Sequence, residues 1–288
     1  MSWAVWTESD ARSALDEAFE RPIGSARVAA VLDAWADEED AGAPRRRGLR
    51  LRVDGPIRPR GRAQAPELDW RIRVEAPGRT VDARLVNARG RATVALDGAT
   101  YEASRPVLGA VAAAVLGPPD VPAPPDFPAP PDPATPPDAT GPHPRRWFHE
   151  VTRQGEDFAA GAATERFKTS LRLDRVLEDL TGALDAVPGA ALVLPPQTLP
   201  TPSERRGLAF ALRGASADVQ VAREDGTLRA IHARGRFRVP ASRRTAARGL
   251  LGGGFSLSLV LHEVGAEHPI AEPVAARPLP DLLRKGAR

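Results

Sequence analysis

Residues 67–76 have the sequence Glu-Leu-Asp-Trp-Arg-Ile-Arg-Val-Glu-Ala, and this stretch decides the fold. Apolar and charged side chains alternate along it, which gives a β-strand with one apolar face and one charged face. The same alternation returns in other parts of the chain. The pattern therefore predicts an antiparallel sheet that is buried on one side and solvated on the other.

Strands are predicted on both sides of this segment. The N-terminal group covers 49–54, 67–76, 80–88 and 91–97, and Pro77-Gly78 and Arg89-Gly90 form short turns between the last three. The C-terminal group covers 163–171, 216–223, 227–239 and 252–263, with a hairpin turn at 224–226. Short turns of this kind indicate an antiparallel meander. Residues 26–36 are rich in alanine and fit either a helix or a strand.

Four amphipathic helices are expected between the strands. The first begins after the N-cap Thr7, with Asp10 at N3, and ends before Pro22. The others cover about 104–117, a segment beginning at Asp174, and a segment beginning at the capping box 201–204. No βαβ order occurs, so the fold class is α+β. Helices on the apolar face of a curved sheet leave either a trough for an apolar ligand or a closed dry core, and the pattern does not choose between them.

The charges are unevenly distributed along the 288 residues. Residues 1–40 hold ten acids and three arginines, a balance of −7, whereas residues 41–91 hold fourteen arginines and five acids, a balance of +9. Two mutually compensating, solvated faces explain this distribution best, and an anionic partner is the alternative. The chain has no cysteine, which excludes disulfides and thiolate metal sites. No apolar run reaches the length of about 18 residues that a membrane span needs.

A proline-rich segment separates the two groups of strands. Thirteen of the 27 residues from Pro118 to Pro144 are proline, and Pro-Pro-Asp recurs every six residues. In a polyproline II helix of about three residues per turn this period places the aspartates on one edge. We expect a stiff, acidic spacer, with a docking strip for a partner as the alternative.

The motifs of catalysis and of metal binding are weak. His262, Glu263 and His268 do not have the spacing of a helical zinc motif, and no G-x-S-x-G sequence occurs. Residues 251–254, Leu-Gly-Gly-Gly, precede a strand instead of a helix, so we expect a bulge or a turn there and no phosphate loop. We therefore predict that the protein is not an enzyme and has neither a cofactor nor a bound metal.

Arginine clusters raise the question of nucleic-acid binding. They occur at 45–47, 58–62 and 234–238. The acids interleaved on the same strands favour cross-strand charge pairing instead. We therefore predict no nucleic-acid partner.

Several short motifs together resemble a known family. They are Gly55-Pro-Ile-Arg, Ala65-Pro-Glu-Leu-Asp, Asp97-Gly-Ala-Thr-Tyr101, Pro144-Arg-Arg-Trp147, Gly161 leading to Leu173-Asp174, Pro269-Ile-Ala-Glu-Pro273 and Arg277-Pro-Leu. Outside the proline-rich segment, residues 9–284 resemble actinobacterial lipoproteins of the LppX/LprG kind. The resemblance implies a LolA-like fold, a curved antiparallel half-barrel wrapped around helices with an apolar cavity, and a role as a lipid carrier. It also implies that 26–36 is a strand.

The resemblance sets the expected organisation and location. Residues 1–117 and 145–288 would form the two halves of a single LolA-like domain, with 118–144 as the inserted spacer. An extracytoplasmic place in the cell envelope is implied. The chain as given has no signal peptide and no lipobox cysteine, so contact with a membrane surface would require an upstream leader or anchor.

The predicted function is non-catalytic binding of a lipid or other apolar small molecule by a monomer. The alternative is an interaction protein with a filled core, which recruits an envelope protein through the acidic spacer or the arginine-rich sheet face. Strand parity gives the cavity-lining candidates, with two residues of the helix at 104–117 added. They are Leu51, Trp70, Ile72, Leu85, Val94, Val107, Val111, Phe167, Val219, Leu257 and Leu259.

Overall fold

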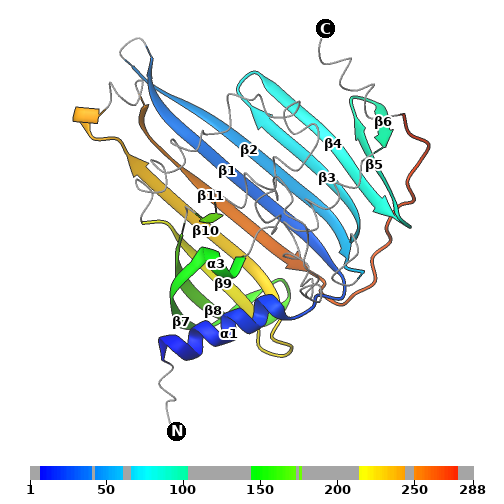
Figure 1. Ribbon diagram of the computed structural model, residues 1–288, viewed down its shortest axis with the longest axis horizontal. Coiled ribbons are helices and arrows are strands. Elements are labelled where there is room, and N and C mark those ends of the chain that lie inside the picture. Colours follow the sequence, from blue (N-terminus) through cyan, green and yellow to red (C-terminus); the bar gives the residue numbers. More distant parts are fainter. Residues whose placement is uncertain are drawn as a thin grey trace, which may run out of the picture.

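An open sheet of eleven antiparallel strands forms the body of the protein (Figure 1). The computed structural model describes residues 7–40, 43–60, 66–102, 144–172, 175–176, 214–243 and 250–277. The strand order is β6-β5-β4-β3-β2-β1-β11-β10-β9-β8-β7. The strands are β1 (Ala26–Asp40), β2 (Ala43–Arg58), β3 (Glu67–Ala76), β4 (Arg79–Ala88), β5 (Arg91–Leu96), β6 (Ala99–Glu102), β7 (Phe148–Ala159), β8 (Ala162–Leu171), β9 (Ser216–Ala222), β10 (Leu228–Arg238) and β11 (Leu250–His262).

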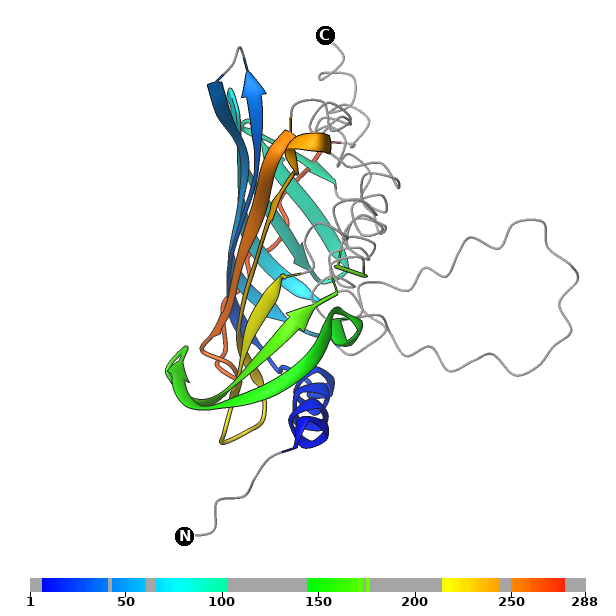
Figure 2. The ribbon, with the colours of Figure 1, turned by 90° about the vertical axis from the view of Figure 1, so that its left-hand side faces the viewer.

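The sheet is curved, and both of its edges bend toward the side on which α1 (Glu8–Glu20) lies (Figure 2). We call this side the inner face. The strands before and after residues 103–143 meet where β1 pairs with β11, from Arg27 opposite His262 to Glu38 opposite Leu250. Both groups of strands therefore contribute to one continuous sheet.

The strand register aligns apolar side chains across the inner face. One row crosses nine strands from β8 to β5, and each member lies opposite the next. It consists of Phe167, Val219, Ile231, Leu259, Ala30, Val53, Ile72, Ala83 and Leu96. Because side chains alternate between faces with a period of two, the charged residues between these positions lie on the outer face.

Helix α1 covers the inner face beside β7. Thr7 is its N-cap and forms a capping box with Asp10, and Ala11, Leu15 and Ala18 are its buried residues. Phe19 stacks on Phe148 of β7 with ring centroids 5.4 Å apart. The helix is therefore anchored to the edge of the sheet that curls most strongly toward it (Figure 2).

The predicted fold class, α+β with a curved antiparallel sheet, is confirmed, and the sheet is open. The helix after Thr7 and the predicted strands are present, and 26–36 belongs to a strand, β1, that pairs on both sides along most of its length. Strands β6 and β7 were not predicted, and β2 begins six residues before its expected start. The proline-rich segment before Pro144, the helix expected at 104–117 and the helix expected from the capping box 201–204 lie outside the described residues, as does the helix from Asp174 apart from residues 175–176. A short helix, α3 (Pro144–Trp147), and a 3-10 turn, η2 (Ala241–Arg243), complete the described elements.

The glycines at 252–254 lie within β11, and the bulge expected there is opposite Asp37 and Glu38. A turn does not form, because the segment pairs with β1 and β10. A Cβ atom at Gly254 would lie 2.5 Å from the Gly235 carbonyl oxygen, and one at Gly253 would lie 2.4 Å from the Trp35 carbonyl oxygen. Glycine is therefore needed here because the backbones of the neighbouring strands approach too closely for a side chain.

Candidate ligand-binding face

The cavity-lining candidates within the described residues share the inner face. All nine stand at positions of the same parity in the paired strands, and Trp70, Leu85 and Val94 lie in one cross-strand row. Leu257 lies opposite Leu32, which in turn lies opposite Leu51. The other two candidates, Val107 and Val111, lie outside the described residues.

Burial divides these nine candidates into two groups. Four of them, Trp70, Leu85, Phe167 and Val219, are between 0% and 6% exposed. The others are partly buried, namely Leu51, Ile72, Val94, Leu257 and Leu259. Side chains of similar apolar character thus differ in how completely the protein covers them.

We define the central apolar patch as the partly buried inner-face residues of β1, β2, β3 and β11. Its members are Ala30, Leu32, Leu51, Val53, Ile72, Leu257 and Leu259. Leu32 was not among the predicted cavity-lining residues, because its segment was ambiguous between helix and strand. Val53 was not among them either, although the alternation that identified Leu51 assigns Val53 to the same face.

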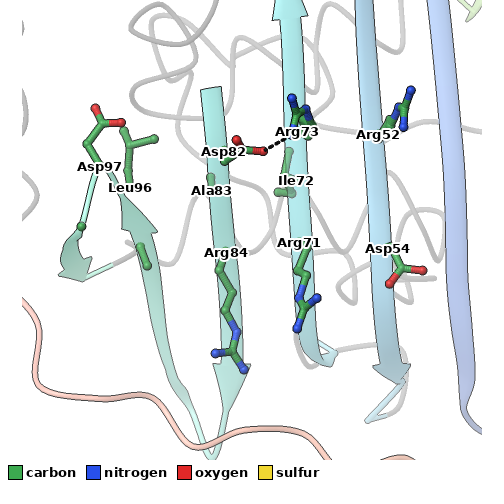
Figure 3. A pocket seen from close by; sticks show the side chains of 12 residues that line it. Arg52, Asp54, Arg71, Ile72, Arg73, Asp82, Ala83, Arg84, Leu96 and Asp97 are labelled. Carbon is green, nitrogen blue, oxygen red and sulfur yellow. Dashed lines mark ion pairs between the residues drawn. The ribbon is translucent and has the colours of Figure 1, made fainter. Parts of the chain in front are cut away.

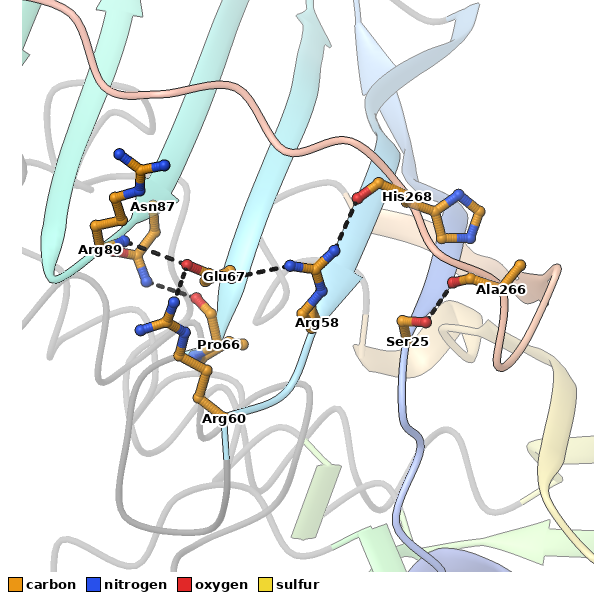
Figure 4. A network of polar contacts seen from close by, with 9 residues as sticks. All are labelled: Ser25, Arg58, Arg60, Pro66, Glu67, Asn87, Arg89, Ala266 and His268. Carbon is orange, nitrogen blue, oxygen red and sulfur yellow. Dashed lines mark hydrogen bonds and ion pairs between the residues drawn. The ribbon is translucent and has the colours of Figure 1, made fainter.

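A polar network lies at one end of the strands, where β2 ends and β3 begins (Figure 4). The carboxylate of Glu67, whose side chain is 8% exposed, accepts hydrogen bonds from Arg58 at 3.4 Å and from Arg60. Arg58 also donates from Nη2 to the His268 carbonyl at 3.2 Å. Because Glu67 is buried but paired with two guanidinium groups, its charge is compensated.

The C-terminal segment, residues 264–277, runs along this end of the sheet. The Gly265 amide donates to the Ser25 carbonyl at 2.8 Å, and the Ser25 hydroxyl donates to the Ala266 carbonyl (Figure 4). At its far end Arg277 exchanges backbone hydrogen bonds with Thr100 and Glu102 of β6 at 2.9 and 2.8 Å. The segment therefore links the start of β1 to β6, the strand at one edge of the sheet.

The outer face carries ion pairs that join neighbouring strands. Asp33 and Asp37 of β1 pair with Arg50 and Arg46 of β2 at 3.2 and 2.7 Å. The acidic and basic runs of the sequence thus face one another, as the favoured interpretation of the charge distribution predicted. Pairs of this exposed kind each contribute about 0–1 kcal/mol.

The ion pair between Asp69 and Arg84 on the outer face is bidentate. Two parallel hydrogen bonds of 2.8 and 2.7 Å join Nε and Nη2 of Arg84 to the two carboxylate oxygens. These bonds from Arg84 hold the pKa of Asp69 below its usual value, and a hydrogen bond from the Ala271 backbone adds to the effect. Conversely, Asp69 raises the pKa of Arg84.

Two open hollows lie on the outer face. The larger has a volume of about 510 Å³ and lies over β2 to β5 beside Arg52, Arg71, Arg73 and Arg84 (Figure 3). Arg73 pairs with Asp82 at 3.6 Å, whereas Arg52 and Arg71 form no ion pair with any described residue. Charged side chains of neighbouring strands thus stand beside this hollow, although apolar atoms make up most of its lining.

The smaller hollow, of about 440 Å³, lies near Trp35. The guanidinium groups of Arg46 and Arg236 lie 5.5 and 5.8 Å from the centre of the Trp35 ring. These distances are typical of cation–π contacts. The half-buried indole is therefore already in contact with two cations of the protein itself.

The histidines considered as metal ligands do not assemble into a site in the described part of the chain. His268 lies 3.6 Å from the Glu263 carboxylate, and no third ligand joins them among the described residues. Within the same ranges, no helix is both long and apolar enough to cross a membrane.

Comparison with known proteins gives structural matches alone. LprF from Mycobacterium bovis matches with a TM-score of 0.45 and 11% identity over 93% of this chain and 98% of its own. The lipoprotein LppX from Mycobacterium tuberculosis matches with a TM-score of 0.40 and 12% identity over 92% of this chain and all of its own. The chain resembles lipoproteins of the LppX/LprG kind.

A LolA superfamily protein from Nitrosomonas europaea matches less well, with a TM-score of 0.21 and 9% identity over 90% of this chain and 94% of its own. No family model and no curated protein sequence matches the chain.

Proposed function

We propose that the protein binds a lipid or another apolar ligand against the central apolar patch and performs no chemistry on it. One observation carries the proposal: the middle of a continuous apolar face is only partly buried, although the same face is fully buried beside α1. Large apolar surfaces that a protein leaves partly uncovered mark binding sites.

The geometry suits an elongated ligand. The row from Phe167 to Leu96 crosses nine strands, and strands lie about 4.8 Å apart, so an apolar chain could extend across several of them. Burial of about 400 Å² of hydrocarbon would contribute on the order of 10 kcal/mol before the entropy cost of binding. Affinity would then depend on the shape of the patch more than on a single polar contact.

The proposal extends to the candidate residues and the location. Leu51, Ile72, Val94, Leu257 and Leu259 would form most of the contact with the ligand, and the more deeply buried Trp70, Leu85, Phe167 and Val219 would flank them on the same face. Val107 and Val111 would cover the ligand from the helix expected at 104–117. Residues 1–117 and 145–288 would work as one domain, a monomer in the cell envelope.

A titration with a fluorescent acyl-chain probe tests the proposal. The probe should bind with an affinity that changes less than twofold between 0.1 and 1 M salt, because apolar contacts are not screened by ions. Leu257→Trp, which fills the patch, should weaken binding about tenfold, whereas Ser258→Trp, the adjacent outer-face position on β11, should leave it unchanged. Equal effects of the two variants would exclude the inner face as the site.

One observation favours a second candidate function, recruitment of an anionic partner protein by the outer face. Arg52, Arg71, Arg234 and Arg238 form no ion pair with any described residue, and the first two line the larger hollow. Binding through these residues would weaken steeply with salt. Native mass spectrometry of protein isolated from its own host separates the candidates, because a copurifying lipid supports the first and a copurifying polypeptide supports the second.

A further inference from the structure

Within the part of the chain that the structure describes, two buried polar atoms on the inner face of β3 and β4 have no hydrogen-bond partner. The indole Nε1 of Trp70 is one, and the amide Oδ1 of Asn87 is the other. Trp70 is 6% exposed and Asn87 is 3% exposed, so neither atom is satisfied by bulk water. Buried groups of this kind normally have partners, and exceptions therefore call for an explanation.

The orientation of the Asn87 amide follows from its other contact. Its Nδ2 donates to the Pro66 carbonyl at 2.5 Å (Figure 4). A backbone carbonyl can only accept, so the nitrogen must face Pro66 and the oxygen must point elsewhere. Oδ1 is therefore an acceptor held in place by the protein and left without a donor.

The strand register brings this acceptor close to the donor. Leu68 lies opposite Asn87 and Trp70 lies opposite Leu85, so Trp70 and Asn87 are diagonal neighbours on one face of β3 and β4. Diagonal neighbours have β-carbons about 7–8 Å apart. Two hydrogen bonds of about 2.9 Å through one oxygen atom join a donor and an acceptor about 5 Å apart, which side chains of this size can achieve.

We propose that Trp70 Nε1 and Asn87 Oδ1 bind one hydroxyl group of the ligand. The proposal rests on the proposed function and specifies its ligand as a neutral, hydroxyl-bearing lipid. A hydroxyl oxygen accepts from the indole N–H, and its proton is donated to the amide oxygen. An ether or ester oxygen satisfies the indole alone, and a carboxylate has no proton for Asn87 and would lose hydration on this apolar face.

The position of the pair also sets the direction of the ligand. Trp70 and Asn87 stand on β3 and β4, to one side of the central apolar patch, and Ile72 lies two residues from Trp70 on the same face. A ligand anchored here by its hydroxyl would extend its hydrocarbon across β2, β1 and β11. The fully buried surface beside α1 would remain outside its path.

Three ligands of equal chain length test the pair by competition against the fluorescent probe. Oleyl alcohol offers both a hydrogen-bond donor and an acceptor. Its methyl ether offers an acceptor alone, and 9-octadecene offers neither. The wild-type protein should bind the alcohol about tenfold more tightly than the ether, a difference of about 1.4 kcal/mol. Trp70→Phe should weaken the alcohol and the ether five- to tenfold and leave the hydrocarbon within twofold.

The control is Trp35→Phe on the outer face, which should change none of the three affinities. Equal affinities of the wild-type protein for all three ligands would overturn the hydroxyl site and leave the lipid-binding proposal intact, since a bound water molecule would then satisfy both atoms. If Trp70→Phe weakened the binding of all three ligands equally, the indole ring would act by its shape and not by its N–H group. This result too would overturn the hydroxyl site. Binding of none of the three by the wild-type protein would overturn both proposals.

Discussion

The two regions of the inner face differ in what covers them. Beside α1, Leu15, Phe167 and Val219 are at most 1% exposed and belong to a filled core. In the central apolar patch, Leu51 and Leu257 have the same apolar character and the same strand parity but are only partly buried. The comparison shows that alternation decides which face is apolar, whereas the covering elements decide whether that face becomes a core or a binding surface.

The largest effect is expected at the filled end. Phe167→Ala should lower the free energy of unfolding by about 3–5 kcal/mol, because it leaves a cavity where the surroundings are closely packed. Urea denaturation would measure the loss as a lower midpoint with an unchanged slope. In the protein that remains folded, probe affinity should stay within twofold of wild type. A cost below about 1 kcal/mol would mean that this end is not filled.

Leu257→Ala is the matched change in the central apolar patch. Its side chain is partly buried, so the loss of stability should be about 1–2 kcal/mol, smaller than at Phe167. Probe affinity should fall about fivefold, because the residue contacts the ligand. Denaturation and probe titration on the same preparation would measure both. If Phe167→Ala and Leu257→Ala lost stability and probe affinity in equal proportion, the distinction between the filled end and the central apolar patch would be wrong.

Thr7→Ala separates the helix from the patch. It removes the side chain that accepts a hydrogen bond from the Asp10 amide at 3.2 Å, and loss of an N-cap costs about 1 kcal/mol. Because α1 covers the filled end, probe affinity should not change. Thr7→Ser, which keeps the hydroxyl, is the control and should retain most of the stability. A loss of affinity in Thr7→Ala alone would place α1 at the ligand.

These predictions depend on features that the sequence reveals to different degrees. The capping box at Thr7 and Asp10 is local, so the sequence identified it and the structure confirms it. The alternation in 67–76 likewise identified β3 with its bounds. Such signals are strong because a single period or a single cap determines the local backbone.

The features that were missed depend on distant partners. Strand β6 has four residues and pairs with β5 and with Arg277, a contact across a long stretch of sequence. Strand β7 contains two irregularities in its register with β8, which interrupt the period of two. The orphan atoms of Trp70 and Asn87 depend on which strands lie side by side, so no local pattern predicts them. The cavity itself stays a proposal for the same reason.

The smallest effect is expected on the outer face, at Asp69 and Arg84. Because Arg84 holds the pKa of Asp69 below its unfolded value of about 3.9, the pair stabilises the fold above that pH, and this contribution is lost as the pH falls through the lowered pKa. Asp69→Asn should cost under about 1 kcal/mol at pH 7, since Arg84 is half exposed. Urea midpoints of the variant and the wild type should differ most at neutral pH and converge as the pH falls below about 4. A gap that widened toward acid would show that the carboxylate is destabilising when charged. Probe affinity should be unchanged throughout, because the ion pair lies on the face of the sheet opposite the central apolar patch.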